Sequence, residues 1–186
     1  MVLVTGAPGS GKSTLARELA RELRVPYLAR DDVRGGLLFS AGAWTDALHA
    51  VPSSDEAVDL FLDLIEMMLE RRLSCVVEYV VRTNRPADLE RLLAAGDCVV
   101  ITTVSARALQ RFITRNLNDR LISNPAVLDV IGHQSVESHT EAAAERMRRV
   151  EAEMCGRVPV PMLSVDTDDG YQPPIDDIVE FATQSL

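Results

Sequence analysis

A glycine-rich stretch near the start of the chain has the residue types and spacing of a phosphate-binding loop. It reads Gly6-Ala7-Pro8-Gly9-Ser10-Gly11-Lys12-Ser13 and fits the pattern G-x-x-x-x-G-K-[ST], the P-loop, at every fixed position. The glycines let successive backbone N–H groups converge on an anion, and a following helix adds the positive end of its dipole. Lys12 supplies a positive charge for the β and γ phosphates of a nucleotide, and the Ser13 hydroxyl is placed to reach Mg²⁺.

The segments on either side of this stretch are those that a nucleotide-binding loop requires. Val2, Leu3 and Val4 form a short apolar run that predicts a buried parallel strand. Residues 14–23 predict a helix with leucines on one face, at positions 15, 19 and 23. The alternative, a glycine turn before an ordinary helix, is disfavoured by this context, so we assign Gly6 to Thr14 to nucleotide binding.

A second candidate site follows the second predicted strand, at residues 25–29. The segment Arg30-Asp31-Asp32-Val33-Arg34 brings two acids and two arginines to a strand end, where ligands bind in open α/β sheets. A carboxylate there can accept the proton of an attacking hydroxyl. The competing interpretation is that one aspartate only caps the next helix. Because adjacent residues at a strand end point to opposite sides, we expect only one of Asp31 and Asp32 to face the phosphate loop.

Glu78 interrupts the apolar third strand, predicted at residues 74–80. A buried acid costs free energy unless it is paired or holds an ion. Glu78 is therefore a candidate to act on Mg²⁺ or its waters, or to bind a substrate hydroxyl. The alternative is an ion pair with Arg82 or Arg85 in the polar loop that follows. Arg82, at the same edge of the sheet, is a further candidate for substrate binding.

Two arginines lie one helical turn apart on the helix predicted at residues 106–117. Arg111 and Arg115 lead into a stretch with helix-breaking residues, which predicts a lid over about residues 116–134. Such a pair suits the neutralisation of charge on a phosphoryl group in transfer and the exclusion of water. The alternative is a solvated basic helix face.

The rest of the chain alternates strands and helices, which predicts an α/β fold. A capping serine and an acidic first turn predict that a helix begins at Ser54. The remaining expected elements are a helix from Pro86 to Ala95, the fourth strand at 98–104, a helix at 135–154, an edge strand at 158–165, a turn at 166–170 and a closing helix at 174–183.

Length and composition limit the classes of protein. A chain of 186 residues predicts one domain, residues 1–186, and a net charge of −9 argues against an extended nucleic-acid surface. Three cysteines, Cys75, Cys98 and Cys155, are expected as free thiols in a reducing compartment. The first strand starts at the first Met, so no signal peptide is expected, and no apolar run approaches ~20 residues, the length of a membrane span. We expect a cytoplasmic protein and leave its oligomeric state open.

These motifs together resemble those of the P-loop hydroxyl kinases, which include phage-type polynucleotide 5′-kinase, chloramphenicol phosphotransferase, zeta toxin and gluconate kinase. The resemblance implies a three-layer P-loop fold with a small lid. Its parallel sheet has five strands, with the P-loop strand central and the third strand beside it. It also implies that Asp31 is the general base, that Arg34 holds an acceptor phosphate or orients Asp31, and that Arg111 and Arg115 are lid arginines on the nucleotide. Asp32 is left as a helix cap or a supporting partner.

This chain departs from those kinases at two places. Their third strand usually ends in Asp, whereas here it ends in Glu78-Tyr79. The acceptor-binding region between Gly35 and Ser53, which sets the substrate, matches none of them.

The function expected from the sequence is transfer of the γ-phosphate of ATP, with Mg²⁺, to the hydroxyl of a small-molecule acceptor. The catalytic residues would be Asp31, Lys12 and Arg115. A polynucleotide or nucleoside 5′-hydroxyl kinase is the alternative within this class. A nucleotide-monophosphate kinase is less favoured because its anionic acceptor needs no carboxylate base. The rival from another class is a nucleotide-dependent switch or ATPase module, but the chain has no N-K-x-D guanine motif and is shorter than an AAA+ machine with its helical lid domain would require.

Overall fold

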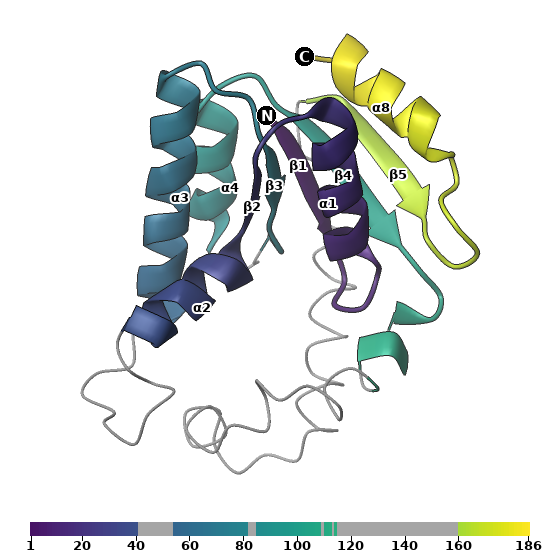
Figure 1. Ribbon diagram of the computed structural model, residues 1–186, viewed down its shortest axis with the longest axis horizontal. Coiled ribbons are helices and arrows are strands. Elements are labelled where there is room, and N and C mark those ends of the chain that lie inside the picture. Colours follow the sequence, from purple (N-terminus) through teal and green to yellow (C-terminus); the bar gives the residue numbers. More distant parts are fainter. Residues whose placement is uncertain (41–53, 82–84, 109, 113, 115–159) are drawn as a thin grey trace.

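A five-stranded sheet, parallel throughout, forms the centre of the molecule (Figure 1). The computed structural model describes residues 1–40, 54–81, 85–108, 110–112, 114 and 160–186. The strand order is β2-β3-β1-β4-β5, which confirms the predicted central position of the P-loop strand and the edge position of the last strand. The strands are β1 (Val2–Gly6), β2 (Tyr27–Ala29), β3 (Val76–Glu78), β4 (Val99–Val104) and β5 (Met162–Asp166).

The register of the strands brings their polar ends to one edge of the sheet. Val4 of β1 and Ala29 of β2 both pair with Glu78 at the end of β3. Gly6, where β1 ends, pairs with Thr103 of β4. The strand arrows in Figure 1 point toward this edge, and both chain termini lie at the other end. Ligand-binding residues at strand ends therefore meet at one place.

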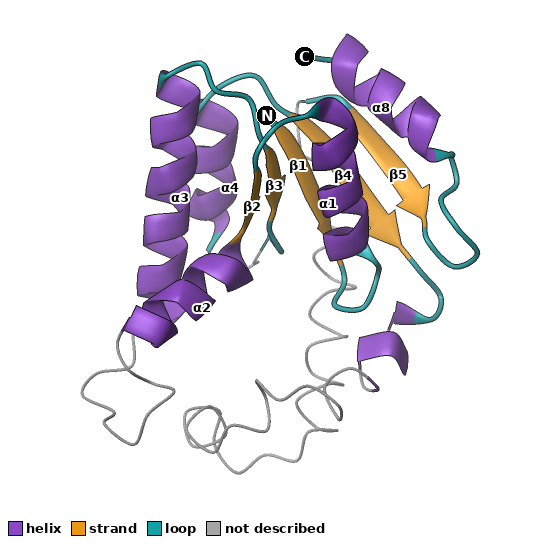
Figure 2. Ribbon diagram, viewed as in Figure 1, coloured by secondary structure: helices purple, strands orange, loops and turns teal. Residues whose placement is uncertain are grey.

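Helices cover both faces of the sheet, as Figures 1 and 2 show. Side chains alternate along β1, so Val2 and Val4 pack on α1 (Lys12–Leu23) and α8 (Ile175–Gln184). Leu3 points the other way, into the cluster formed with α3 (Ser54–Glu70) and α4 (Pro86–Ala94). The strands are apolar on both sides because each side is buried, which is the pattern that parallel sheets require.

The helix α2 (Arg30–Ser40) corrects one sequence-based expectation. The chain becomes helical at Arg30, so Asp31 and Asp32 lie in the first helical turn and not at a strand end. The argument that the two side chains must alternate is therefore wrong. Acidic residues are favourable in a first turn because they face the positive end of the helix dipole. The helix also runs through Gly35 and Gly36, and it is anchored by Leu38, which is buried.

One arginine connects α3 to the start of α4. Arg85, just before α4, forms ion pairs with Asp55 and Asp59 of α3 and with Asp88 of α4, at 2.6 to 3.0 Å. Asp88 is buried and also accepts a hydrogen bond from the Tyr79 hydroxyl at 2.5 Å. Exposed ion pairs stabilise little by themselves, but a buried carboxylate with two donors fixes the geometry of the chain that leaves β3.

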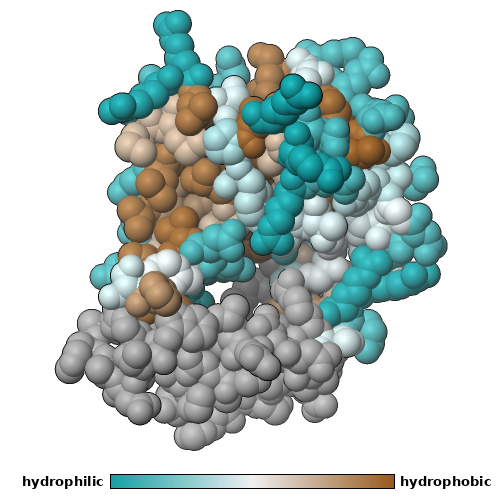
Figure 3. Space-filling view, in the orientation of Figure 1, coloured by the Kyte–Doolittle hydropathy of each residue, from teal (hydrophilic) through white to brown (hydrophobic). Residues whose placement is uncertain are grey.

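The space-filling view in Figure 3 shows hydrophobic side chains along α3. Two of its large hydrophobic residues, Leu60 and Met67, are exposed.

No helix within the described ranges has the length and apolar content needed to cross a lipid bilayer. The predicted lid at 116–134 and the helix expected at 135–154 lie outside the described residues.

The described cysteines give the first testable prediction. Cys75 and Cys98 are free and buried, and burial raises the pKa of both thiols, that of Cys98 to about 11. At pH 8 few of these thiols are thiolates, which are the reactive form. In a Cys155→Ser variant, both remaining thiols should be unreactive toward a disulfide reagent at pH 8 and should react once urea unfolds the chain. Rapid reaction of the folded variant would contradict this burial.

Candidate active site

The P-loop joins the end of β1 to the start of α1, and glycine is required at two of its turns. Gly9 has φ 83°, and a Cβ built there would lie 2.0 Å from the carbonyl oxygen of Ala108. Gly11 has φ 82° and is the N-cap of α1. Residues with side chains rarely adopt such φ values, so these positions explain why the motif is glycine-rich.

Hydroxyl groups from two strand ends, those of β4 and β5, hold the loop in place. Thr103 Oγ1 donates to the carbonyl of Thr5 at 3.1 Å, so it accepts the hydrogen bond from Ser10 Oγ at 2.6 Å. From the other side, Thr167 Oγ1 donates to the Ser10 carbonyl at 2.8 Å. Ser10 and Thr103 are fully buried. The loop is thus fixed by β1, by β4 and by the residue after β5, before any ligand binds.

A cavity of about 280 Å³ lies at the mouth of this loop. It lies at the start of α1, where the positive end of the helix dipole favours an anion. Lys12 is 8% exposed, and its Nζ donates to the Ala7 carbonyl at 3.4 Å. The lining residues are Gly9, Gly11, Lys12, Ser13, Thr14 and Arg111, which brings together most of the residues that the sequence assigns to the nucleotide.

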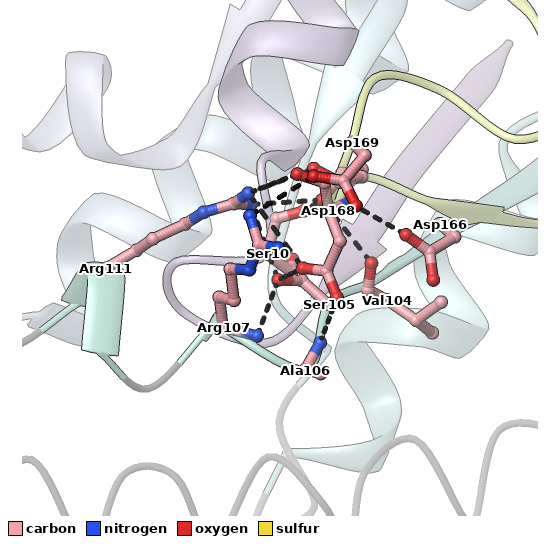
Figure 4. A network of polar contacts seen from close by, with 10 residues as sticks. Ser10, Val104, Ser105, Ala106, Arg107, Arg111, Asp166, Asp168 and Asp169 are labelled. Atoms are coloured by element: carbon pink, nitrogen blue, oxygen red, sulfur yellow. Dashed lines mark hydrogen bonds and ion pairs between the residues drawn. The ribbon is translucent and has the colours of Figure 1, made fainter.

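Arg111 reaches this cavity from the segment after β4 and is held by the turn after β5 (Figure 4). Its Nη2 donates to the carbonyls of Thr167 and Asp168, both at 3.1 Å, and its Nη1 lies 3.4 Å from Ser105 Oγ and from Thr167 Oγ1. Asp168 Oδ1 is 3.9 Å from Nη2. The guanidinium is therefore oriented by fixed oxygens at the edge of the cavity.

Sequence reasoning missed the partners of Arg111. The sequence predicts only a turn at residues 166–170, yet Asp168 accepts hydrogen bonds from Ser105 Oγ at 2.5 Å and from the Ala106 amide at 3.0 Å. The pKa of the Asp168 carboxyl is lowered, and the largest cause is the hydrogen bond from Ser105 Oγ. The topology could have indicated these partners, because a turn after a parallel strand lies at the same edge of the sheet as the P-loop.

Glu78 lies beside the first turn of α1 and is 8% exposed. Ser13 Oγ donates to Glu78 Oε1 at 2.6 Å, and the Tyr27 hydroxyl donates to Oε2. Burial, followed by this hydrogen bond, raises the pKa of Tyr27. The alternative ion pair with Arg85 is not formed, because the ion pairs of Arg85 are those with Asp55, Asp59 and Asp88.

The donor set at Ser13 and Glu78 fits Mg²⁺. A hydroxyl and a carboxylate are oxygen ligands of the kind that this ion binds, together with nucleotide phosphates and water. Because a carboxylate only accepts hydrogen bonds, the proton on Ser13 Oγ points to Glu78, and the lone pairs of this oxygen stay available to a cation.

A second, smaller cavity of about 20 Å³ also has Lys12 on its wall. Asp31 lines it and forms an ion pair with Arg30 at 2.8 Å, whereas Asp32, which is also exposed, does not line it. The Asp31 side chain is 79% exposed. The lining residues are Lys12, Ala29, Arg30, Asp31, Glu78 and Val80.

Arg34 lies one turn further along α2 and is partly buried. Its Nε is buried and has no hydrogen-bond partner within the described residues. Burial, and then repulsion from Arg30, lowers the pKa of Arg34. An unsatisfied buried donor that carries charge is a place where an anion would bind favourably. The other two predicted site residues, Arg82 and Arg115, lie outside the described residues.

Comparison with known proteins shows the family. Residues 2–141 match the family model described as "AAA domain". The chain belongs to the AAA domain family. It is 32% identical over 115 residues to a cytidylate kinase of Pyrobaculum neutrophilum, covering 60% of this chain and 62% of that protein. It is 33% identical over 78 residues to a cytidylate kinase of Ignicoccus hospitalis, covering 42% and 45%. These matches span about half of the relatives' lengths.

Solved structures share the fold of this AAA domain protein. A chain described as a putative kinase from Chloroflexus aurantiacus has a TM-score of 0.70 and 21% identity, with 100% of this chain and 97% of that chain covered. A shikimate kinase from Bacteroides thetaiotaomicron has a TM-score of 0.51 and 14% identity, with 98% and 96% covered. The fold is therefore the P-loop fold found in kinases, as the sequence predicted.

Arg111 gives a prediction about nucleotide affinity. Because a fixed guanidinium lines the cavity, Arg111→Ala should raise the Kd for ATP by about tenfold, as for loss of a charged hydrogen bond of ~1.5 kcal/mol. Titration calorimetry measures this. Arg107→Ala is the matched control, since Arg107 is 60% exposed, pairs with Asp169 and does not line the cavity. Equal loss in both variants would show that Arg111 acts only through general charge.

Proposed function

We propose that this AAA domain protein is a kinase that transfers the γ-phosphate of ATP to a hydroxyl of a small-molecule acceptor. The observation that carries the proposal is the position of Lys12 on the wall of both cavities. One cavity has the lining of a nucleotide phosphate site, and the other contains a carboxylate, Asp31. A phosphoryl group held at Lys12 would lie between the two.

On the donor side, the P-loop amides and Lys12 would bind the β and γ phosphates. Ser13 would be a ligand of Mg²⁺, with Glu78 acting on the ion directly or through its waters. When bound, this ion would neutralise charge on the phosphates. Arg111 would add a positive charge at the nucleotide. Arg115, four positions further along the sequence, is proposed to stabilise the phosphoryl group during transfer.

On the acceptor side, Asp31 is proposed as the general base. The acceptor oxygen attacks the γ-phosphorus, the bond from phosphorus to the β–γ bridging oxygen breaks, ADP leaves, and the hydroxyl proton passes to Asp31. The smaller cavity, at about 20 Å³, has room for one water-sized group, which suits a hydroxyl oxygen. Arg30, which forms an ion pair with Asp31 at 2.8 Å, would hold the carboxylate in place beside the acceptor.

A second candidate is a kinase whose acceptor is a phosphate, as in a nucleoside monophosphate. The unpartnered Nε of Arg34 beside Arg30 favours an anionic group on the acceptor. The similarity to proteins named cytidylate kinase points the same way. An acceptor with both a hydroxyl and an anionic group, such as a nucleotide or polynucleotide 5′-hydroxyl end, would satisfy Asp31 and Arg34 together.

The deciding experiment is a screen for labelled product with γ-labelled ATP. The panel contains alcohols and sugars, nucleosides, oligonucleotides with a 5′-hydroxyl, and nucleoside monophosphates. A labelled phosphate ester supports the hydroxyl kinase, and a labelled diphosphate supports the second candidate. Slow hydrolysis of ATP that no acceptor accelerates would favour the nucleotide-dependent switch or ATPase module.

Lys12 gives the prediction that tests the shared phosphate position. Lys12→Ala should abolish transfer to any acceptor, because it removes the positive charge between the two cavities. The rate with labelled ATP and the circular dichroism spectrum should be measured together. A folded variant with wild-type turnover would contradict the proposal.

The two aspartates give the prediction that tests the base. Asp31→Asn keeps the side chain's size but cannot take a proton, so kcat should fall by at least ~10²-fold with the Kd for ATP nearly unchanged. Asp32→Asn is the matched control, since Asp32 is in the same helical turn and does not line the cavity. It should keep its activity and lose less than about 1 kcal/mol of unfolding free energy, from the helix dipole. If both variants stay active, the result supports the second candidate, a kinase whose acceptor is a phosphate.

A further inference from the structure

Tyr27 lies in the layer between the sheet and α1, directly behind the proposed metal site. Ala29 of β2 pairs with Glu78 of β3, and Tyr27 is two residues before Ala29, so all three side chains point to the same face of the sheet. That face is the one covered by α1, which begins with the P-loop residues Lys12 and Ser13. The Tyr27 hydroxyl therefore reaches Glu78 on the face of the sheet that α1 covers, and Tyr27 lines neither cavity.

Each oxygen of the Glu78 carboxylate has its own donor. Oε1 accepts from Ser13 Oγ at 2.6 Å, and Oε2 accepts from the Tyr27 hydroxyl. The ring of Tyr27 is itself held, because the guanidinium carbon of Arg17 lies 5.1 Å from its centroid. Arg17 is one helical turn after Ser13 on α1. Tyr27 thus connects the helix that carries Ser13 to the strand that carries Glu78.

The length of the Glu78 side chain explains why such a connection matters. A glutamate has one more rotatable bond than an aspartate, so its carboxylate reaches further but takes up more orientations. A hydrogen bond to the second oxygen removes that freedom. With the carboxylate fixed, the Ser13 hydroxyl keeps its hydrogen bond to Glu78, and the lone pairs of Ser13 Oγ face the cavity.

We propose that Tyr27 is a positioning residue, which acts through Glu78 to orient Ser13 for the metal ion that accompanies the nucleotide. This inference rests on the proposed function only in taking a metal–nucleotide complex as the ligand. Partners of this kind, one step removed from the metal, change metal affinity by about 10- to 100-fold when they are removed.

The test is the affinity for ATP with and without Mg²⁺, measured by calorimetry on the full chain. Tyr27→Phe should weaken binding in the presence of Mg²⁺ by about tenfold and leave metal-free binding unchanged. Paramagnetic resonance of Mn²⁺ added with ATP should show the same loss directly. A role in stability alone would lower the melting temperature and leave the ratio of the two affinities as in the wild type, which would overturn the proposal.

Tyr171→Phe is the matched control. The Tyr171 hydroxyl also donates to a glutamate on α1, Glu18 Oε2 at 2.9 Å, but neither residue lines the two cavities. This variant loses the same kind of hydrogen bond at another place and should keep the wild-type ratio. An equal loss in Tyr171→Phe would overturn the specific role of Tyr27.

A double-mutant cycle tests whether Tyr27 acts through Glu78. Glu78→Gln should itself weaken Mg²⁺-dependent binding, and adding Tyr27→Phe to it should have little further effect. Fully additive losses would overturn the inference. Failure of the proposed function is recognised separately, since a wild-type chain that binds ATP with Mg²⁺ but labels no acceptor contradicts the kinase and leaves the Tyr27 result standing. If Mg²⁺ does not change the affinity of the wild-type chain for ATP, the proposed role of Tyr27 is overturned.

Discussion

The parallel register of β1, β3 and β4 is the constraint on which the candidate site depends. It places Gly6, Glu78 and Thr103 at one edge of the sheet, although they are separated by up to 97 positions in the sequence. Hydrogen bonds with Thr103 and Thr167 then fix Ser10 in the loop. A slip of one residue in this register would turn Glu78 to the other face of the sheet, away from Ser13.

Burial of charge explains the arrangement around Lys12. Lys12 and Glu78 are both 8% exposed, and both line the smaller cavity. Charged groups in such places are retained when partners hold them, and Glu78 is held by two hydroxyl groups. The same fixed geometry, prepared before the ligand binds, is what stabilisation of a phosphoryl transition state requires.

The proposed acceptor side differs from the phosphate loop because it is built on a helix. Arg30, Asp31 and Arg34 lie within the first five residues of α2, so their relative positions follow from helical geometry. Asp31 and Arg30 neutralise each other, while Arg34 is left without a described partner for its buried Nε. The unpartnered Nε of Arg34 would suit a negative group on the proposed acceptor, in addition to the group that reacts.

The sequence by itself determined the P-loop, the order of the elements and the parallel sheet, because these depend on local spacing and on the period of apolar residues. It also singled out Asp31, Glu78 and Arg111, which the structure places on the walls of the two cavities. The tertiary structure decided what those residues contact. The hydrogen bonds of Arg111 to Thr167 and Asp168, and that of the Tyr27 hydroxyl to Glu78, join segments distant in sequence. Side-chain hydrogen bonds form only where packing brings such segments together, and no local pattern of residues encodes them.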